Sequence, residues 1–229
     1  NKTTRVSVNT DGLPVDAFSF STSPALSASG RFVVFASRAT NLVPNDTNYA
    51  TDIFVNDQLT GKTNRISVDS SGNEGNGNSH FIELENPWLT DTGICACFTL
   101  FDPFAIGSGT PAISADGRFL AFDSYASNLV AADMNTSQDV FLHDQNTGKT
   151  RRVSVDSRGK EARLGSGFPS LSADARTLVF ASKGAIMDVQ YSIFNPVERI
   201  YAKDLYVNSG KNADEARGRA ESVRIRNEE

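Results

Sequence analysis

The sequence is short of the residues on which several kinds of catalytic site depend. Only two of its 229 residues are histidine, His80 and His143, and only two are cysteine, Cys95 and Cys97. It contains no G-x-S-x-G motif and no H-E-x-x-H motif. These absences argue against a serine hydrolase with a nucleophile elbow and against a zinc peptidase. Catalytic carboxylate pairs stay open, because strand residues that meet in space lie far apart in sequence.

The two cysteines are separated by a single residue, Ala96. On a β-strand their side chains would point to the same face, ~7 Å apart, which strains a disulfide. We therefore expect two small buried apolar residues, and we favour that interpretation over a metal-binding or redox-active pair.

Charge and hydropathy exclude two classes of partner. The net charge is −5, the isoelectric point is about 5.1, and basic residues form no stripe, so we expect no nucleic-acid partner. No apolar run approaches the ~18 residues that span a membrane. The first 30 residues lack the charged head, apolar core and cleavage site of a signal peptide.

The main feature that the sequence does contain is an internal repeat. The segment Pro111–Asp156 repeats Pro24–Asp69 without a gap at an offset of 87 residues, and 27 of the 46 positions are identical. Such repeats indicate an architecture in which one structural unit is used several times.

Each copy predicts four short strands. In the second copy, Asp116-Gly117 marks a tight hairpin turn between the first two strands. The run 118–122 is almost wholly apolar, as in a strand covered on both faces, whereas 150–155 alternates apolar and polar residues like an outer strand. We therefore predict an all-β protein, a β-propeller built from four-stranded antiparallel blades.

The repeated pattern P-x-[LI]-S-A-x-G-R-F-x-x-F-x-S, followed by N-L-V, D-x-N, D-[IV]-F and T-G-x-T-x-R-[VI]-S-V, resembles the TolB-type, WD-repeat-like β-propeller repeat family of bacteria. The resemblance covers most of residues 2–205. It implies a propeller that is exported to the periplasm or the cell exterior. The family includes scaffolds, binding modules and appendages of larger enzymes, so the resemblance defines the fold better than the function.

The repeat predicts one propeller domain over residues 1–206 and a charged C-terminal extension over 207–229. The predicted blades lie near 24–68, 87–106, 111–155 and 169–205, about four in all, and the second of them is degenerate. Residues 2–8 match the fourth strand of a blade. They would close the ring against the last third strand, near Arg199–Asp204, or else the chain is a fragment of a larger propeller.

A D-x-N-x-x-x-D pattern occurs once in each copy and is the best candidate for a metal site. Alternating oxygen donors on a turn can converge on calcium, as at the start of an EF-hand loop, although the glycine and glutamate of that motif are missing here. The competing interpretation is that these residues cap turns through their own backbone. The candidate ligands are Asp46, Asn48 and Asp52, and Asp133, Asn135 and Asp139.

Two further charged positions recur in both copies, an aspartate and an arginine. Asp57 and Asp144 end the third strands, and we expect them to be structural hydrogen-bond acceptors. Arg65 and Arg152 are expected to be partners at the blade edges. His143 replaces Asn56 of the first copy, so the pattern predicts no role for it in every repeat.

These observations favour a non-catalytic, exported binding or scaffold propeller. It would bind a protein or a surface polysaccharide through its loops. The alternative is a propeller domain, or a fragment, of a hydrolase or a polysaccharide-degrading enzyme. Histidine and arginine gathered around a metal at the mouth of the ring would favour the enzyme.

Overall fold

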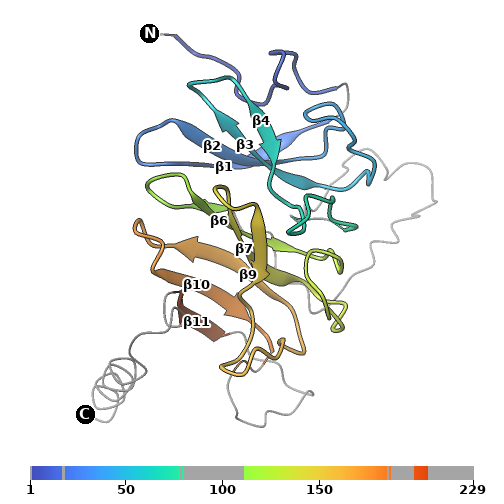
Figure 1. Ribbon diagram of the computed structural model, residues 1–229, viewed down its shortest axis with the longest axis vertical. Helices are drawn as coiled ribbons and strands as arrows, with labels where there is room; N and C mark the ends of the chain where they lie inside the picture. The colour runs from blue at the N-terminus through green and yellow to red at the C-terminus, as the bar shows by residue number, and fades with distance from the viewer. Residues whose placement is uncertain are drawn as a thin grey trace, which may run out of the picture.

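The computed structural model describes residues 2–16, 19–77, 79, 111–184, 186 and 199–205. These residues form eleven strands in three antiparallel sheets (Figure 1). No helix among them is long and apolar enough to cross a membrane.

The first sheet follows the chain order β1-β2-β3-β4, and the second follows β5-β6-β7-β8. The third has the order β11-β10-β9. The predicted four antiparallel strands per repeat are confirmed in both complete copies. The bounds are β1 Ser21–Leu26, β2 Phe32–Ser37, β3 Asp52–Asp57, β4 Thr63–Arg65, β5 Ala112–Ile113, β6 Phe119–Ser124, β7 Asp139–Asp144, β8 Lys149–Arg152, β9 Ser166–Leu171, β10 Thr177–Ser182 and β11 Arg199–Asp204.

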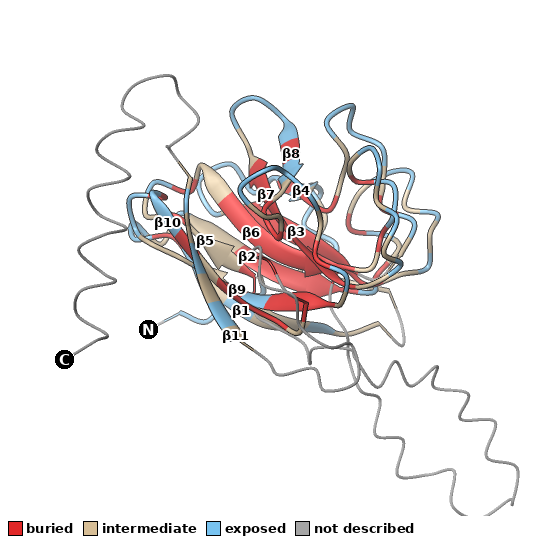
Figure 2. Cartoon of the chain, turned by 90° about the horizontal axis from the view of Figure 1, so that it is seen from below, coloured by how far each residue is buried: buried red, intermediate tan, exposed pale blue. Residues whose placement is uncertain are grey.

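The apolar second strand of each repeat lies inside its sheet and is covered on both faces (Figure 2). In the first blade Phe35 pairs with Phe54 across β2 and β3, with ring centroids 6.0 Å apart, and the second blade repeats this contact through Phe122 and Phe141 at 5.8 Å. Each such buried side chain contributes ~1.5–3 kcal/mol relative to an exposed one.

The largest apolar cluster lies between the first two sheets. Alternate residues of β2 face this cluster, while Phe35 faces the other side of the sheet. The sheets therefore stack face to face, as propeller blades do. The buried members of the cluster are Val34, Ala36, Ile53, Val55, Ile66, Leu120, Phe122, Ala126, Leu129 and Phe141.

The two complete repeats are adjacent blades. The backbone amide of Ala28 donates to the carbonyl of Ala115 at 3.2 Å. Gly117 lies against the ring of Phe32 so closely that a Cβ at this position would be 2.2 Å from a ring carbon. The two complete repeats are therefore direct neighbours in the stack, and the degenerate blade expected at 87–106 stays a prediction. The segment itself lies outside the described residues.

Ser79 takes part in a contact that recurs in all three blades. In each blade two serine hydroxyls lie within hydrogen-bond distance of each other, and in the second blade Ser79 is one of the two. The amides of Ser79 and Ser166 each donate, at 2.7 Å, to the carbonyl just before the third strand of the preceding blade. The pairs are Ser21–Ser37 at 3.1 Å, Ser79–Ser124 at 3.0 Å and Ser166–Ser182 at 2.8 Å.

A proline follows the first serine of the pair in every blade. The spacing is three residues in the first and third blades (24 − 21 and 169 − 166), but it is 32 residues in the second (111 − 79). The serine and the proline of the second blade are therefore much further apart in sequence than those of the other two blades.

The N-terminal residues do not close a ring onto β11. The hydroxyl of Thr63 in β4 donates to the carbonyl of Val8 at 2.5 Å, just as Thr150 in β8 donates to Val68. Residues 2–8 therefore lie beside the first blade, at the opposite end of the stack from β11 (Figure 1). The predicted pairing with β11 is wrong. Val8 contacts the first blade in the same way as Val68, which follows the first blade, contacts the second blade.

Candidate functional site

The structure gathers the three predicted ligands of each copy at one corner of their blade. In the first copy, Asp46 and Asn48 lie in the loop that leads into β3, and Asp52 begins that strand. The second copy has the same arrangement through Asp133, Asn135 and Asp139. The two corners therefore have the same arrangement of these side chains.

An arginine lies at the centre of the first cluster. The Nη1 atom of Arg65, at the end of β4, is 3.5 Å from a carboxylate oxygen of Asp46 and 3.4 Å from one of Asp52. Glu74 supplies a third carboxylate, 2.8 Å from the same nitrogen. The Arg65 side chain is only 9% exposed. A guanidinium therefore occupies the position in which a bound cation would contact all three carboxylates.

The second cluster repeats this geometry with slightly shorter distances. Nη1 of Arg152 lies 3.3 Å from Asp133, 3.1 Å from Asp139 and 2.6 Å from Glu161. In each cluster the other terminal nitrogen donates to a loop carbonyl, which belongs to Asn45 or Ala132. Each arginine thus ties the end of its fourth strand to the preceding loop and to the connection that follows it.

Asn48 is positioned as a turn residue. Its side-chain nitrogen donates to Asp52 at 3.0 Å and to the carbonyl of Gly75 at 2.8 Å, while its oxygen accepts the backbone amide of Ala50 at 2.8 Å. Asn135 makes the same three contacts in the second blade. These contacts are the ones expected if the asparagines cap turns through the backbone.

Burial makes these carboxylates weaker acids. Desolvation raises the pKa of Asp46 to about 6, and it raises the pKa of Asp139 to about 6 as well. The pKa values of Asp52 and Asp133 are also raised by burial. Three carboxylates share one guanidinium, so each cluster favours uptake of a proton at mildly acidic pH.

The carboxylate oxygens of Asp133, Asp139 and Glu161 lie within 4.8 Å of one another, a spacing at which a metal ion could be held. Arg152 already contacts all three, however, and the side-chain oxygen of Asn135 faces the backbone. The arrangement fits a guanidinium better than calcium. Calcium binding stays a prediction, which is tested below.

Sequence reasoning missed Glu74 and Glu161. A signal was present, because both end a D-S-x-G-x-E stretch at the same 87-residue offset, just beyond the compared repeat. Asp57 and Asp144 are structural hydrogen-bond acceptors, as expected. Arg31 donates to Asp57 through two bonds of 2.8 Å, and Arg118 donates to Asp144 in the same way within the second blade.

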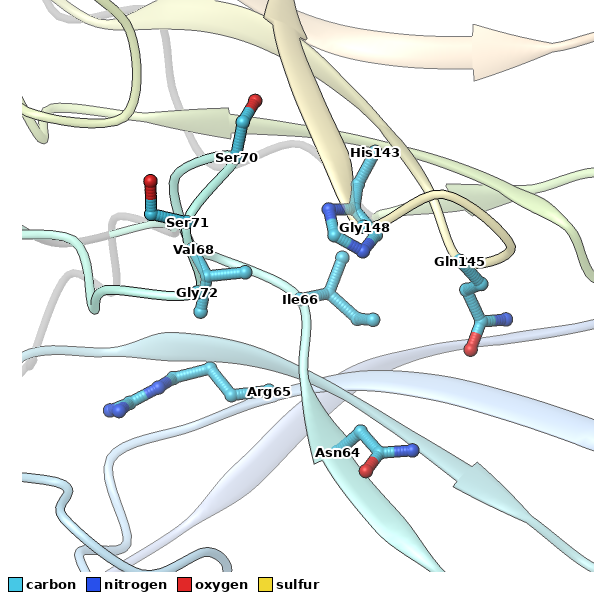
Figure 3. A pocket seen from close by; sticks show the side chains of 10 residues that line it. All are labelled: Asn64, Arg65, Ile66, Val68, Ser70, Ser71, Gly72, His143, Gln145 and Gly148. Carbon is cyan, nitrogen blue, oxygen red and sulfur yellow. The ribbon is translucent and has the colours of Figure 1, made fainter.

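A groove of about 500 Å³ opens between the first two blades (Figure 3). Residues of β4 and the loop after it line one side, and residues of β7 and the β7–β8 turn line the other. His143 is one of the lining residues and is only 5% exposed. The side chain of Arg65 extends away from His143 (Figure 3). Sequence analysis gave no reason to select this histidine.

The stacked antiparallel sheets define this chain as a repeat-built β-propeller protein. No protein-family model and no curated protein matches the sequence. Solved structures that match include a putative TolB from Agrobacterium tumefaciens, which is 16% identical with a TM-score of 0.41. The match covers 79% of this chain and 44% of that one.

Two other matching structures are named as proteases. The β-propeller domain of the Trilobed protease from Pyrococcus furiosus is 15% identical, with a TM-score of 0.40, 72% of this chain covered and 34% of that one. The tricorn protease is 16% identical, with a TM-score of 0.38, 71% of this chain covered and 11% of that one. The chain thus spans less than half the length of these three proteins, and the likeness concerns the fold alone.

Proposed function

We propose that this chain is part of an exported, non-catalytic propeller that binds a protein or a surface polysaccharide. The observation that carries the proposal is that the buried charged side chains bind one another within the blades. In both complete blades the buried carboxylates surround an arginine and hold strands and loops together. This is the arrangement of a rigid scaffold, and it leaves the loops and the groove between the blades for binding.

The surroundings of His143 support a binding role over a catalytic one. Its ring bonds Thr150, whose hydroxyl is already donated to a backbone carbonyl. That hydroxyl is therefore not activated as a nucleophile, because the histidine does not accept its proton. Export is supported by the resemblance of the repeats to a family of exported propellers.

The proposal is tested with the purified chain and a panel of extended peptides and bacterial polysaccharides. Binding is measured by biolayer interferometry, and the same mixtures are analysed for products by chromatography. We expect at least one ligand class to bind and to be recovered unchanged. Formation of new products would overturn the proposal in favour of a hydrolase or a polysaccharide-degrading enzyme. Absence of binding across the panel would also overturn it.

A further inference from the structure

We propose that the groove between the first two blades is a subsite for a neutral carbohydrate, one of whose hydroxyls donates a hydrogen bond to Nε2 of His143. This inference rests on the proposed binding function, and it specifies both the place and the ligand class.

The first step is the tautomer of His143. The Nδ1 atom lies 2.9 Å from the hydroxyl oxygen of Thr150, its neighbour across β7 and β8. That hydroxyl donates its hydrogen to the carbonyl of Val68, so it must accept from the ring. Nδ1 therefore carries the proton and Nε2 presents a lone pair. Burial lowers the pKa of His143, which keeps the ring neutral at neutral pH.

The second step is that this lone pair has no protein donor. Among the contacts of the described residues, the only hydrogen bond of the His143 ring is the one to Thr150. The residue as a whole is 5% exposed, and it lines the groove. A ligand donor that reaches into the groove would give this lone pair a hydrogen bond.

In the first blade the residue equivalent to His143 has all of its side-chain hydrogen-bonding groups bound to other protein groups. Asn56 occupies the place of His143 and donates to Thr63 at 2.9 Å. Its remaining oxygen accepts a hydrogen bond from the Gln58 side chain. In the second blade the equivalent glutamine, Gln145, turns away and donates to the carbonyl of Gly117. The acceptor is thus capped in the first blade and open in the second.

The remaining lining selects the ligand class. Asn64, Ser71 and Gln145 carry groups that both donate and accept hydrogen bonds, as the hydroxyls of a sugar do. Ile66 and Val68 add apolar surface for the C–H faces of a ring. The one charged side chain in the lining is Arg65, whose guanidinium is neutralised in its cluster. The groove therefore suits an uncharged, hydroxyl-rich ligand.

The test uses the chain labelled with ¹⁵N-histidine, which gives signals from His80 and His143 alone. We titrate it with the neutral trisaccharides maltotriose, cellotriose and chitotriose. Trigalacturonate and an extended Ala-Ser peptide serve as charged and peptidic comparisons. We expect at least one neutral trisaccharide to shift the His143 Nε2 signal in a saturable way, with no such shift from trigalacturonate or the peptide.

The variant His143→Asn copies the arrangement of the first blade, so it keeps the bond to Thr150 and lets Gln145 cap the position. We expect it to weaken trisaccharide binding, measured by calorimetry, about tenfold. The matched control Asn56→His changes the equivalent position of the first blade and should leave the affinity unchanged. Thermal unfolding of both variants reports whether they fold.

Equal affinity of His143→Asn and wild type would overturn the inference, as would no response of His143 to any neutral trisaccharide. A response to the peptide instead would overturn the ligand class and leave the proposed binding function standing. Binding of a polysaccharide or protein without a shift of the His143 signal would likewise refute only the proposed groove site. Failure of the whole panel would refute the binding function itself.

Discussion

Replacing Arg65 with methionine tests the structural role of the arginine-centred clusters. The substitution keeps much of the side-chain stem but leaves Asp46, Asp52 and Glu74 without their shared cation. Removing one partner from a buried ion pair typically costs about 3–5 kcal/mol, because the remaining charge stays buried. In a chain of this length that corresponds to a fall of about 6–20 °C in the melting temperature.

The measurement is urea denaturation followed by circular dichroism, with melting curves at matched concentration. Arg152→Met should behave in the same way, because its distances repeat those of Arg65. Arg31→Met is the matched control, because Arg31 is 44% exposed and pairs with Asp57 at the surface. Its loss should cost less than about 1 kcal/mol.

The comparison has a clear refutation. If Arg65→Met were no more destabilised than Arg31→Met, the cluster would not hold the blade together. A loss that disappeared on addition of calcium would show instead that the carboxylates accept a metal once the guanidinium is gone. We expect such rescue to be confined to the variant.

Three further predictions follow from the same geometry. Millimolar calcium should leave the melting temperature of the wild-type chain unchanged, because Arg65 and Arg152 occupy the cation positions, and a rise with calcium concentration would restore the metal interpretation. The folded-state pKa of Asp46 and of Asp139 is raised to about 6, above the ordinary 3.8. Their contribution to stability is therefore full below pH 3.8 and lost as the pH rises through about 6, so Asp46→Asn and Asp139→Asn should flatten the fall in unfolding free energy between about pH 4 and pH 6. Finally, Gly117→Ala should cost more than its repeat counterpart Gly30→Ala. Both glycines have positive φ, but only the new Cβ at 117 meets Phe32, so equal losses in urea denaturation would contradict the blade contact.

The sequence was sufficient to predict the blades, because a repeat without gaps reports strands, turns and alternation together. It was insufficient for the contact between the hydroxyls of Ser79 and Ser124, which lie 45 residues apart in sequence. No local pattern records such a pairing.

The candidate sites show the same division. The aspartates and asparagines of the two corners were identified correctly as a group, because they recur in both copies. Their contact with Arg65 and Glu74 was not predicted, because these residues belong to β4 and to the connection after it rather than to the loop that carries the aspartates. His143 differs from its counterpart Asn56, so a search for shared residues passed over it.

The central claim is that this propeller binds a ligand without transforming it. The most direct measurement is calorimetry with the tightest ligand of the panel, followed by chromatography of the recovered sample. The account predicts saturable binding at one site per chain and complete recovery of intact ligand. Recovery of shortened or modified ligand, in an amount that grows with incubation time, would contradict it.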